Sequence, residues 1–272
     1  MQNHTLESQF QITGIGSASG LVYKDNSLFI ISDNSSFLYE YHIREKELTK
    51  IKLFENVQEN IPKKDKHDFE AITLKGNKLY LFGSGSTSKR EKQIIYNLET
   101  KEIEEKDLSE IYRNLKKESS ISDEDLNIEG ALFYDEKWHL FQRGNGVNSK
   151  NGIFILNKKA ENIQFVTISL PKIKHIEATF TDTILVKNKI YFLATAEDCI
   201  STYHDGEILG SIIGRIDCKT MKIDVTQKIS DSHKFEGLTL YNKTEDKIEF
   251  LLCEDNDTEV LETNIYKLVI KN

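Results

Sequence analysis

The chain has 272 residues, of which 38% are hydrophobic and 29% charged, a composition that excludes an intrinsically disordered protein. Its net charge of −8 argues against nucleic acids and anionic membranes as partners, because both would repel it. We find no run of about 18 apolar residues and no apolar signal core in residues 1–16, so we expect a cytoplasmic location and no membrane partner. With no linker-like stretch, a single domain over residues 1–272 is expected.

A short motif recurs along the chain, in which a hydrophobic residue, an acid and a small residue lead into an apolar strand. Three copies contain Glu70, Glu129 and Glu236, and a variant has Ser19 in place of the acid. A fifth copy lies near residues 176–182. Each copy is followed by a turn and a second apolar run, and these runs cover residues 28–31, 79–82, 138–141, 190–193 and 248–252.

Two further strands complete each unit, for example residues 37–43 and 48–54 in the first and 152–157 and 164–170 in the third. Units of four strands that recur at about 40–60 residues predict an all-β protein, a five-bladed β-propeller of four-stranded antiparallel blades. The last unit has three strands, so we expect the N-terminal stretch around Phe10 and Ile12 to close it.

One segment departs from this pattern, because residues 108–115 have helical spacing with Ser109 as a plausible cap. We place a short helix there, between the second and third blades. It would cover the rim, and a lid over the channel is the alternative.

The start of the first strand and the end of the second strand of a blade should meet at one mouth of the central channel. A count of fourteen residues from Ser19, Glu70 and Glu129 reaches Asp33, Ser84 and Arg143. In the fourth unit Asp182 keeps this spacing, reaches a position beside Glu197, and is preferred to Glu177. In the fifth unit the second strand ends at Asp255. The predicted mouth therefore holds Ser19, Asp33, Glu70, Ser84, Glu129, Arg143, Asp182, Glu197, Glu236 and Asp255.

Carboxylates crowded in one small space need a counter-charge or shared protons. Arg143 and Arg90 could supply the charge, or a hard cation could. Oxygen ligands favour Ca²⁺ or Mg²⁺ over zinc, with Glu70, Glu129, Asp182 and Glu236 as the expected ligands. In the alternative, the acids only bond to backbone amides and hold the blades together.

Other residues could contact a ligand from the loops around the mouth. Asn145 follows Arg143, Tyr203 lies in a lengthened loop of the fourth unit, and Ser84 lies in a Gly-Ser-Gly-Ser stretch near Arg90. The three cysteines, Cys199, Cys218 and Cys253, have neither disulfide-framework nor zinc spacing and are expected to be buried thiols.

The segments Ser19–Tyr23, Asp68–Ala71, Asn127–Gly130, Gln142–Asn145 and Ala196–Glu197 resemble a group of uncharacterised bacterial propellers. The pattern is also similar to the SdiA-regulated and esterase-like-phytase propellers and, more distantly, to the five-bladed glutaminyl cyclases. The esterase-like resemblance implies phosphate or ester hydrolysis at an acidic, metal-dependent site. The chain lacks the denser Asp-rich calcium motifs of true β-propeller phytases.

Three functions follow from this sequence, and whether the protein is an enzyme stays open. The first is a monomeric propeller that binds a polar small molecule, such as a sugar or a cationic ligand, at the acidic mouth. The second is a metal-assisted hydrolase or cyclase, in which Glu70 or Glu129 is the general base and Arg143 stabilises negative charge. The third is a protein-interaction scaffold.

Overall fold

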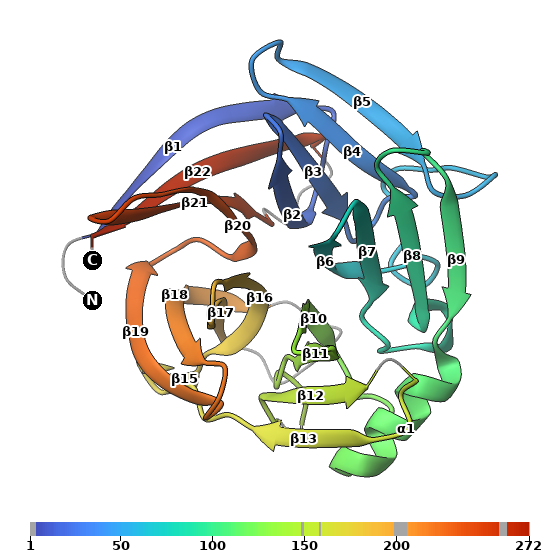
Figure 1. Cartoon of the computed structure of the whole chain (residues 1–272), viewed down its shortest axis with the longest axis vertical. Helices are drawn as coiled ribbons and strands as arrows, with labels where there is room; N and C mark the ends of the chain where they lie inside the picture. Colours follow the sequence, from blue (N-terminus) through green and yellow to red (C-terminus); the bar gives the residue numbers. More distant parts are fainter. Residues whose placement is uncertain (1–3, 148–149, 158, 199–205, 256–259, 272) are drawn as a thin grey trace.

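The computed structural model describes residues 4–147, 150–157, 159–198, 206–255 and 260–271. Five four-stranded antiparallel sheets surround a central axis, so the prediction of an all-β, five-bladed propeller is confirmed (Figure 1). Within the described residues, no helix has the length and hydropathy needed to cross a membrane.

The strands follow the chain from the axis outward in the first four blades. The first blade holds β2 (Ala18–Lys24), β3 (Ser27–Ser32), β4 (Phe37–His42) and β5 (Glu47–Lys52). The second holds β6 (Phe69–Lys75), β7 (Lys78–Gly83), β8 (Lys92–Asn97) and β9 (Ile103–Asp107). The third holds β10 (Ile128–Tyr134), β11 (Lys137–Gln142), β12 (Gly152–Asn157) and β13 (Ile163–Thr167). The fourth holds β16 (Thr179–Val186), β17 (Lys189–Asp198), β18 (Glu207–Asp217) and β19 (Lys222–Ser230).

The fifth blade joins the two ends of the chain. It holds β20 (Phe235–Lys243), β21 (Lys247–Glu254), β22 (Glu262–Lys271) and, on the outside, β1 (His4–Thr13). Strand β1 pairs antiparallel with β22 from His4 opposite Ile270 to Thr13 opposite Glu262. The expected closure by the N-terminal strand is therefore confirmed.

Hydrophobic contacts hold the blades together face to face. Five clusters of buried side chains each join two neighbouring blades, and together they close the ring. Every residue of β3 is buried, as expected for a strand between two blades. Two described cysteines, Cys218 and Cys253, are free, buried thiols, and Cys199 lies outside the described residues.

The expected helix is α1 (Ser109–Ser119), which lies at the outer rim beside β13 (Figure 1). Its buried Tyr112 donates a hydrogen bond to the Gly83 carbonyl at 2.7 Å. The same ring packs on Gly85, which has φ +78°, and a Cβ there would lie 2.5 Å from it. The helix therefore supports the loop after β7, close to a short 3₁₀ turn, η1 (Ser88–Arg90).

A small hairpin connects the third and fourth blades. It consists of β14 (Lys172–Ile173) and β15 (Ile176–Glu177), which pair only with each other. The Glu177 carboxylate accepts a hydrogen bond from the Leu170 amide at 2.9 Å. Glu177, the less favoured candidate for the start of the fourth unit, is therefore not part of a blade.

Candidate functional site at the channel mouth

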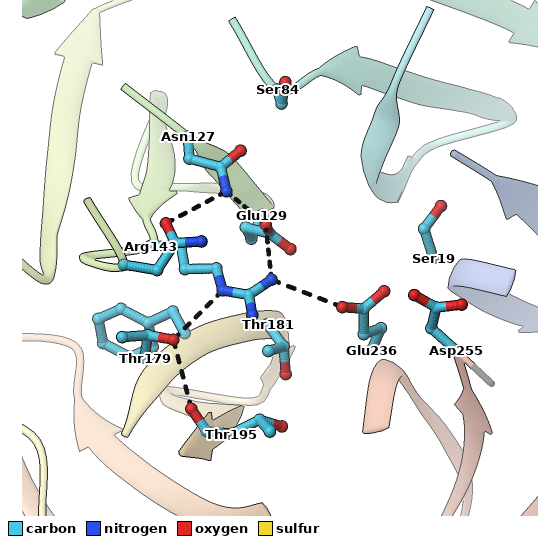
Figure 2. Close-up of polar contacts among 12 residues, drawn as sticks. Ser19, Ser84, Asn127, Glu129, Arg143, Thr179, Thr181, Thr195, Glu236 and Asp255 are labelled. Carbon is cyan, nitrogen blue, oxygen red and sulfur yellow. Dashed lines mark hydrogen bonds and ion pairs between the residues drawn. The ribbon is translucent and has the colours of Figure 1, made fainter. Parts of the chain in front are cut away.

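The inner strand of every blade begins with a β-bulge, which shifts the register with the second strand by one residue. A bulge re-aims the side chain of the extra residue. The bulged residues are Ser19, Glu70, Glu129, Thr181 and Glu236. Figure 2 shows Ser19, Glu129, Thr181 and Glu236 around one central space.

Glycine follows the bulged residue in three blades because the inner strands approach one another closely. A Cβ on Gly237 would lie 2.4 Å from both the Leu21 side chain and the Cys253 sulfur. This contact explains the Glu-Gly and Ser-Gly pairs of the motif.

The second strand brings a partner residue to each bulge. It lies fourteen residues later in the first four blades, and a longer turn places it at Asp255 in the fifth. The five partners are Asp33, Ser84, Arg143, Thr195 and Asp255. Their amides reach back to the residue two positions before the bulge: Ser84 to Asp68 at 2.9 Å, Arg143 to Asn127 at 2.8 Å, and Asp255 to Lys234 at 3.1 Å.

Arg143 links three blades across the mouth (Figure 2). Its guanidinium donates to Glu129 at 3.1 Å and to Glu197 at 2.7 Å, and lies 3.5 Å from Glu236. Its Nε donates to the Thr179 hydroxyl at 3.2 Å. Burial opposes the charge, but the three carboxylates outweigh it and raise the pKa of Arg143 above its ordinary value. Every nitrogen of this side chain is therefore used inside the protein.

Two lysines act as internal counter-ions. The Lys66 ammonium bonds to Asp33 and lies 3.0 Å from Asp68. The Lys234 ammonium lies 3.2 Å from Glu236 and 3.0 Å from Asp255. Each ammonium therefore sits between two carboxylates.

Arg90 lies behind the mouth. It donates to Asp68 and to the Ser86 hydroxyl, both at 2.7 Å, and to the Lys63 carbonyl at 2.8 Å. Ser84 also donates to Asp68. Both predicted residues therefore hold Asp68 in place.

Four carboxylates at the mouth have oxygens without a donor among the described residues: Glu70, Glu129, Asp33 and Glu236, whose two ion pairs use the same oxygen. No donor contacts either oxygen of Glu70, which has 9% of its surface exposed. One oxygen of Glu129 and one of Asp33 are buried and unbonded. Burial and the charges of Glu129, Asp68, Glu236 and Asp33 raise the pKa of Glu70 well above its ordinary value.

The pKa values of the neighbouring acids are raised as well. Burial outweighs the opposing effect of Lys66 and raises the pKa of Asp33 to about 6. Burial also raises the pKa of Glu129, against the effect of Arg143, and that of Glu236 well above its ordinary value, against the effect of Lys234.

The described part of the mouth carries more negative than positive groups. The acids number seven and the basic groups four: Asp33, Asp68, Glu70, Glu129, Glu197, Glu236 and Asp255 face Lys66, Arg90, Arg143 and Lys234. The opposite end of the channel differs, because a cavity of about 330 Å³ there is lined by all five blades and by no acidic or basic side chain. The charged groups of the channel therefore lie at the mouth.

The choice of Asp182 as the fourth leading residue is wrong by one position, since the bulge lies at Thr181. The Asp182 carboxylate accepts hydrogen bonds from the amides of Thr183 and Leu238, both at 2.6 Å. It is therefore engaged at the junction with the fifth blade. Asp182 therefore matches the alternative in which an acid bonds to backbone amides and holds two blades together.

The remaining predicted residues lie around this centre. Glu197 accepts from Arg143 and from the Gly206 amide at 3.0 Å, and the Asn145 side chain lies 3.5 Å from that of Asn127. Tyr203 lies outside the described residues.

Sequence reasoning missed several residues of the mouth: Lys66, Asp68, Asn127, Thr181 and Lys234. A usable signal existed for three of them, because Asp68, Asn127 and Lys234 each stand two residues before a motif glutamate. For Lys66, at the end of a long loop, the sequence offers no such signal.

Among solved structures, the chain is similar in fold to a glutaminyl cyclase from Myxococcus xanthus, with 10% identity, a TM-score of 0.58, and coverage of 99% of this chain and 98% of that one. It is also similar to the Malassezia sympodialis allergen Mala s 1, with 8% identity, a TM-score of 0.57 and 95% coverage of both chains. An exo-1,5-α-L-arabinanase from a bovine ruminal metagenomic library shares 10% identity and a TM-score of 0.52, with 97% of this chain and 95% of that one covered.

A comparison of the sequence with curated proteins finds no match. The resemblance to SdiA-regulated and esterase-like-phytase propellers stays a prediction. A family model matches residues 14–270, nearly the whole propeller. The chain therefore belongs to a family of unknown function (DUF6929).

Proposed function

We propose that the chain binds a small polar ligand at the mouth of its channel and that Glu70 contacts this ligand. One observation carries the proposal. The other six carboxylates of the mouth have a donor inside the protein, whereas Glu70 is about nine-tenths buried and has none among the described residues. A buried carboxylate without a partner is unfavourable, and such groups gather at functional sites.

Catalysis at the same residue is the second candidate. Burial and like charges raise the pKa of Glu70 well above its ordinary value, which favours a role as general acid or base. The fold likeness to a cyclase and an arabinanase makes hydrolysis or cyclisation the reaction class to test. Because the Arg143 nitrogens are all bonded, we assign Arg143 a positioning role toward Glu129.

A metal ion is not required by this proposal. Oxygens of Asp33, Asp68 and Glu70 lie within 4.8 Å of one another, which is close enough for one cation. The Lys66 ammonium already bonds to Asp33 and Asp68, however, and would compete with Ca²⁺ or Mg²⁺ for them. We therefore treat a divalent cation as a competing occupant for experiment to test.

The test is a thermal-shift screen of amines, neutral sugars and carboxylates, each with EDTA, Ca²⁺ or Mg²⁺. A ligand of the mouth should raise the melting temperature of the wild type and lose this effect in Glu70→Gln. Glu45→Gln, at an exposed turn, is the matched control and should respond like the wild type. If every hit acts equally on all three proteins, the ligand does not bind at Glu70 and the proposal fails.

A further inference from the structure

The hydroxyl groups at the mouth direct their protons away from a ligand. Ser19 donates to the Phe69 carbonyl at 2.6 Å, and Thr181 donates to the Phe235 carbonyl at 2.7 Å. Both acceptors are backbone groups of a neighbouring blade. Neither hydroxyl therefore has a proton left for Glu70.

The cationic groups are used as well. Arg143 binds Glu129, Glu197 and Glu236, Lys66 binds Asp33 and Asp68, and Arg90 also binds Asp68. Lys234 lies between Glu236 and Asp255. These are all four basic groups counted at the mouth.

The groups left over are therefore hydrogen-bond acceptors. Among the described residues, they are both oxygens of Glu70 and one oxygen each of Glu129, Asp33 and Glu236. Glu129 is only 2% exposed, and Figure 2 shows its side chain at the edge of the space that Glu236 and Ser19 also border. A group that fills these acceptors must bring several N–H or O–H donors. The excess of acids favours a positive group over an anion, which would be repelled.

Two pairs of carboxylates at this mouth are already bridged by an ammonium group. The Lys66 ammonium bridges Asp33 and Asp68, and the Lys234 ammonium bridges Glu236 and Asp255. An ammonium has three donors and a compact charge, so it can serve two acids at once. Glu70 has Glu129 as its strongest acidic neighbour, but no lysine bonds to it among the described residues.

We propose, on the basis of the function above, that the ligand presents a primary ammonium group, which Glu70 and the unbonded oxygen of Glu129 hold. Such a group is carried by a free alkylamine or by the amino terminus of a peptide. Both sources share this chemistry, and the experiment separates them.

The experiment compares probes of one size that differ in charge and donors. Propylammonium chloride, 1-propanol, sodium propionate and tetramethylammonium chloride are titrated at constant ionic strength and pH 7, by calorimetry and by thermal shift. Alanyl-alanine amide is added as the peptide probe and arabinose as the neutral sugar. A probe that binds only the folded state raises the melting temperature in proportion to its occupancy.

Propylammonium or the peptide amide should bind at least tenfold more tightly than propanol, propionate and tetramethylammonium. Glu70→Gln should weaken the binding at least tenfold, and Glu45→Gln should leave it unchanged. Stronger binding of the peptide amide identifies a peptide amino terminus, and stronger binding of propylammonium identifies a free amine.

Two results would overturn the inference and are distinguishable. If a neutral sugar such as arabinose binds in a Glu70-dependent manner while both amines do not, the mouth binds ligands but does not select ammonium. If no probe binds in a Glu70-dependent manner, the proposed binding function fails together with the inference.

Discussion

Replacing Glu70 by glutamine should stabilise the protein at neutral pH, although it removes a charged group from a network of ion pairs. Glutamine keeps the shape of glutamate and removes its charge. The wild-type carboxylate is buried, has no donor among the described residues, and lies among Asp33, Asp68, Glu129 and Glu236. A neutral side chain avoids this repulsion.

The magnitude follows from the spacing of the charges. Oxygens of Glu70, Asp33 and Asp68 lie within 4.8 Å of one another. Two like charges about 5 Å apart repel by roughly 3 kcal/mol at an effective dielectric constant of about 20. The Lys66 ammonium offsets part of this, so we expect a net gain on the order of 1–3 kcal/mol. For a protein of this size that corresponds to a rise of roughly 2–10 °C in melting temperature.

The pH dependence gives the sharper measurement. The pKa of Glu70 is higher in the folded than in the unfolded protein, so the folded state holds more protons between the two values. Stability is therefore lost as the pH rises through this window. The two proteins should melt alike at pH 4, and Glu70→Gln should melt higher at pH 8. Scanning calorimetry from pH 4 to 8 at fixed ionic strength measures this difference. A variant that melts lower than the wild type at pH 8 would mean that Glu70 has a stabilising partner, and the reasoning would be refuted.

Three further substitutions test other parts of the mouth. Asp182→Asn should lower the free energy of unfolding by about 1–3 kcal/mol, because the side-chain amide of asparagine cannot accept both backbone hydrogen bonds. It should leave ligand binding unchanged. Urea unfolding measures the first effect and the thermal-shift screen the second. Arg143→Met should cost about 3–5 kcal/mol in the same unfolding assay, since it leaves three buried acids without their shared partner; a cost below 1 kcal/mol would contradict the network. Lys66→Met should melt lower than the wild type but regain stability in Ca²⁺, because removing the ammonium frees Asp33 and Asp68 for a cation; the absence of a greater Ca²⁺ effect than in the wild type would exclude a cation site there.

The fold could be predicted from the sequence because each blade repeats the same local signals. A polar residue at the bulge, an apolar strand, a turn and a second apolar strand recur five times. The closure by β1 followed from simple counting, since the last unit lacked a strand. These features depend on short-range patterns, which a single sequence contains in full.

The site could be predicted only in part, because side-chain direction depends on the register at one residue. In the fourth blade the spacing to the residue beside Glu197 favours Asp182, whereas the bulge is at Thr181. A slip of one residue in a strand turns the side chain to the other face. The neutral pair Thr181 and Thr195 keeps the fourteen-residue spacing as well as the charged pairs do. The spacing therefore fits both Thr181 and Asp182 and does not decide between them.

The contacts of the counter-ions could not be predicted for a different reason, although Lys234 stands two residues before a motif glutamate. Lys66 comes from a loop and Lys234 from the residue before a strand, and each reaches its carboxylates with a long side chain. Neither place has a periodic pattern that fixes where such a side chain ends. Without these lysines the acids implied a metal ion, and the structure shows how much of that charge the protein itself balances.

The five equivalent bulges allow the structural and functional roles of the acids to be separated. In the first and fourth blades a hydroxyl occupies this position and bonds to the next blade, from Ser19 to Phe69 and from Thr181 to Phe235. A neutral side chain is therefore sufficient to join two blades at this point. The other three blades carry glutamates, although burial disfavours their charged forms; neighbouring cations offset this for Glu129 and Glu236, whereas the charges around Glu70 add to it. Because a hydroxyl suffices at two of the five bulges, the glutamates at the other three support the proposed ligand site.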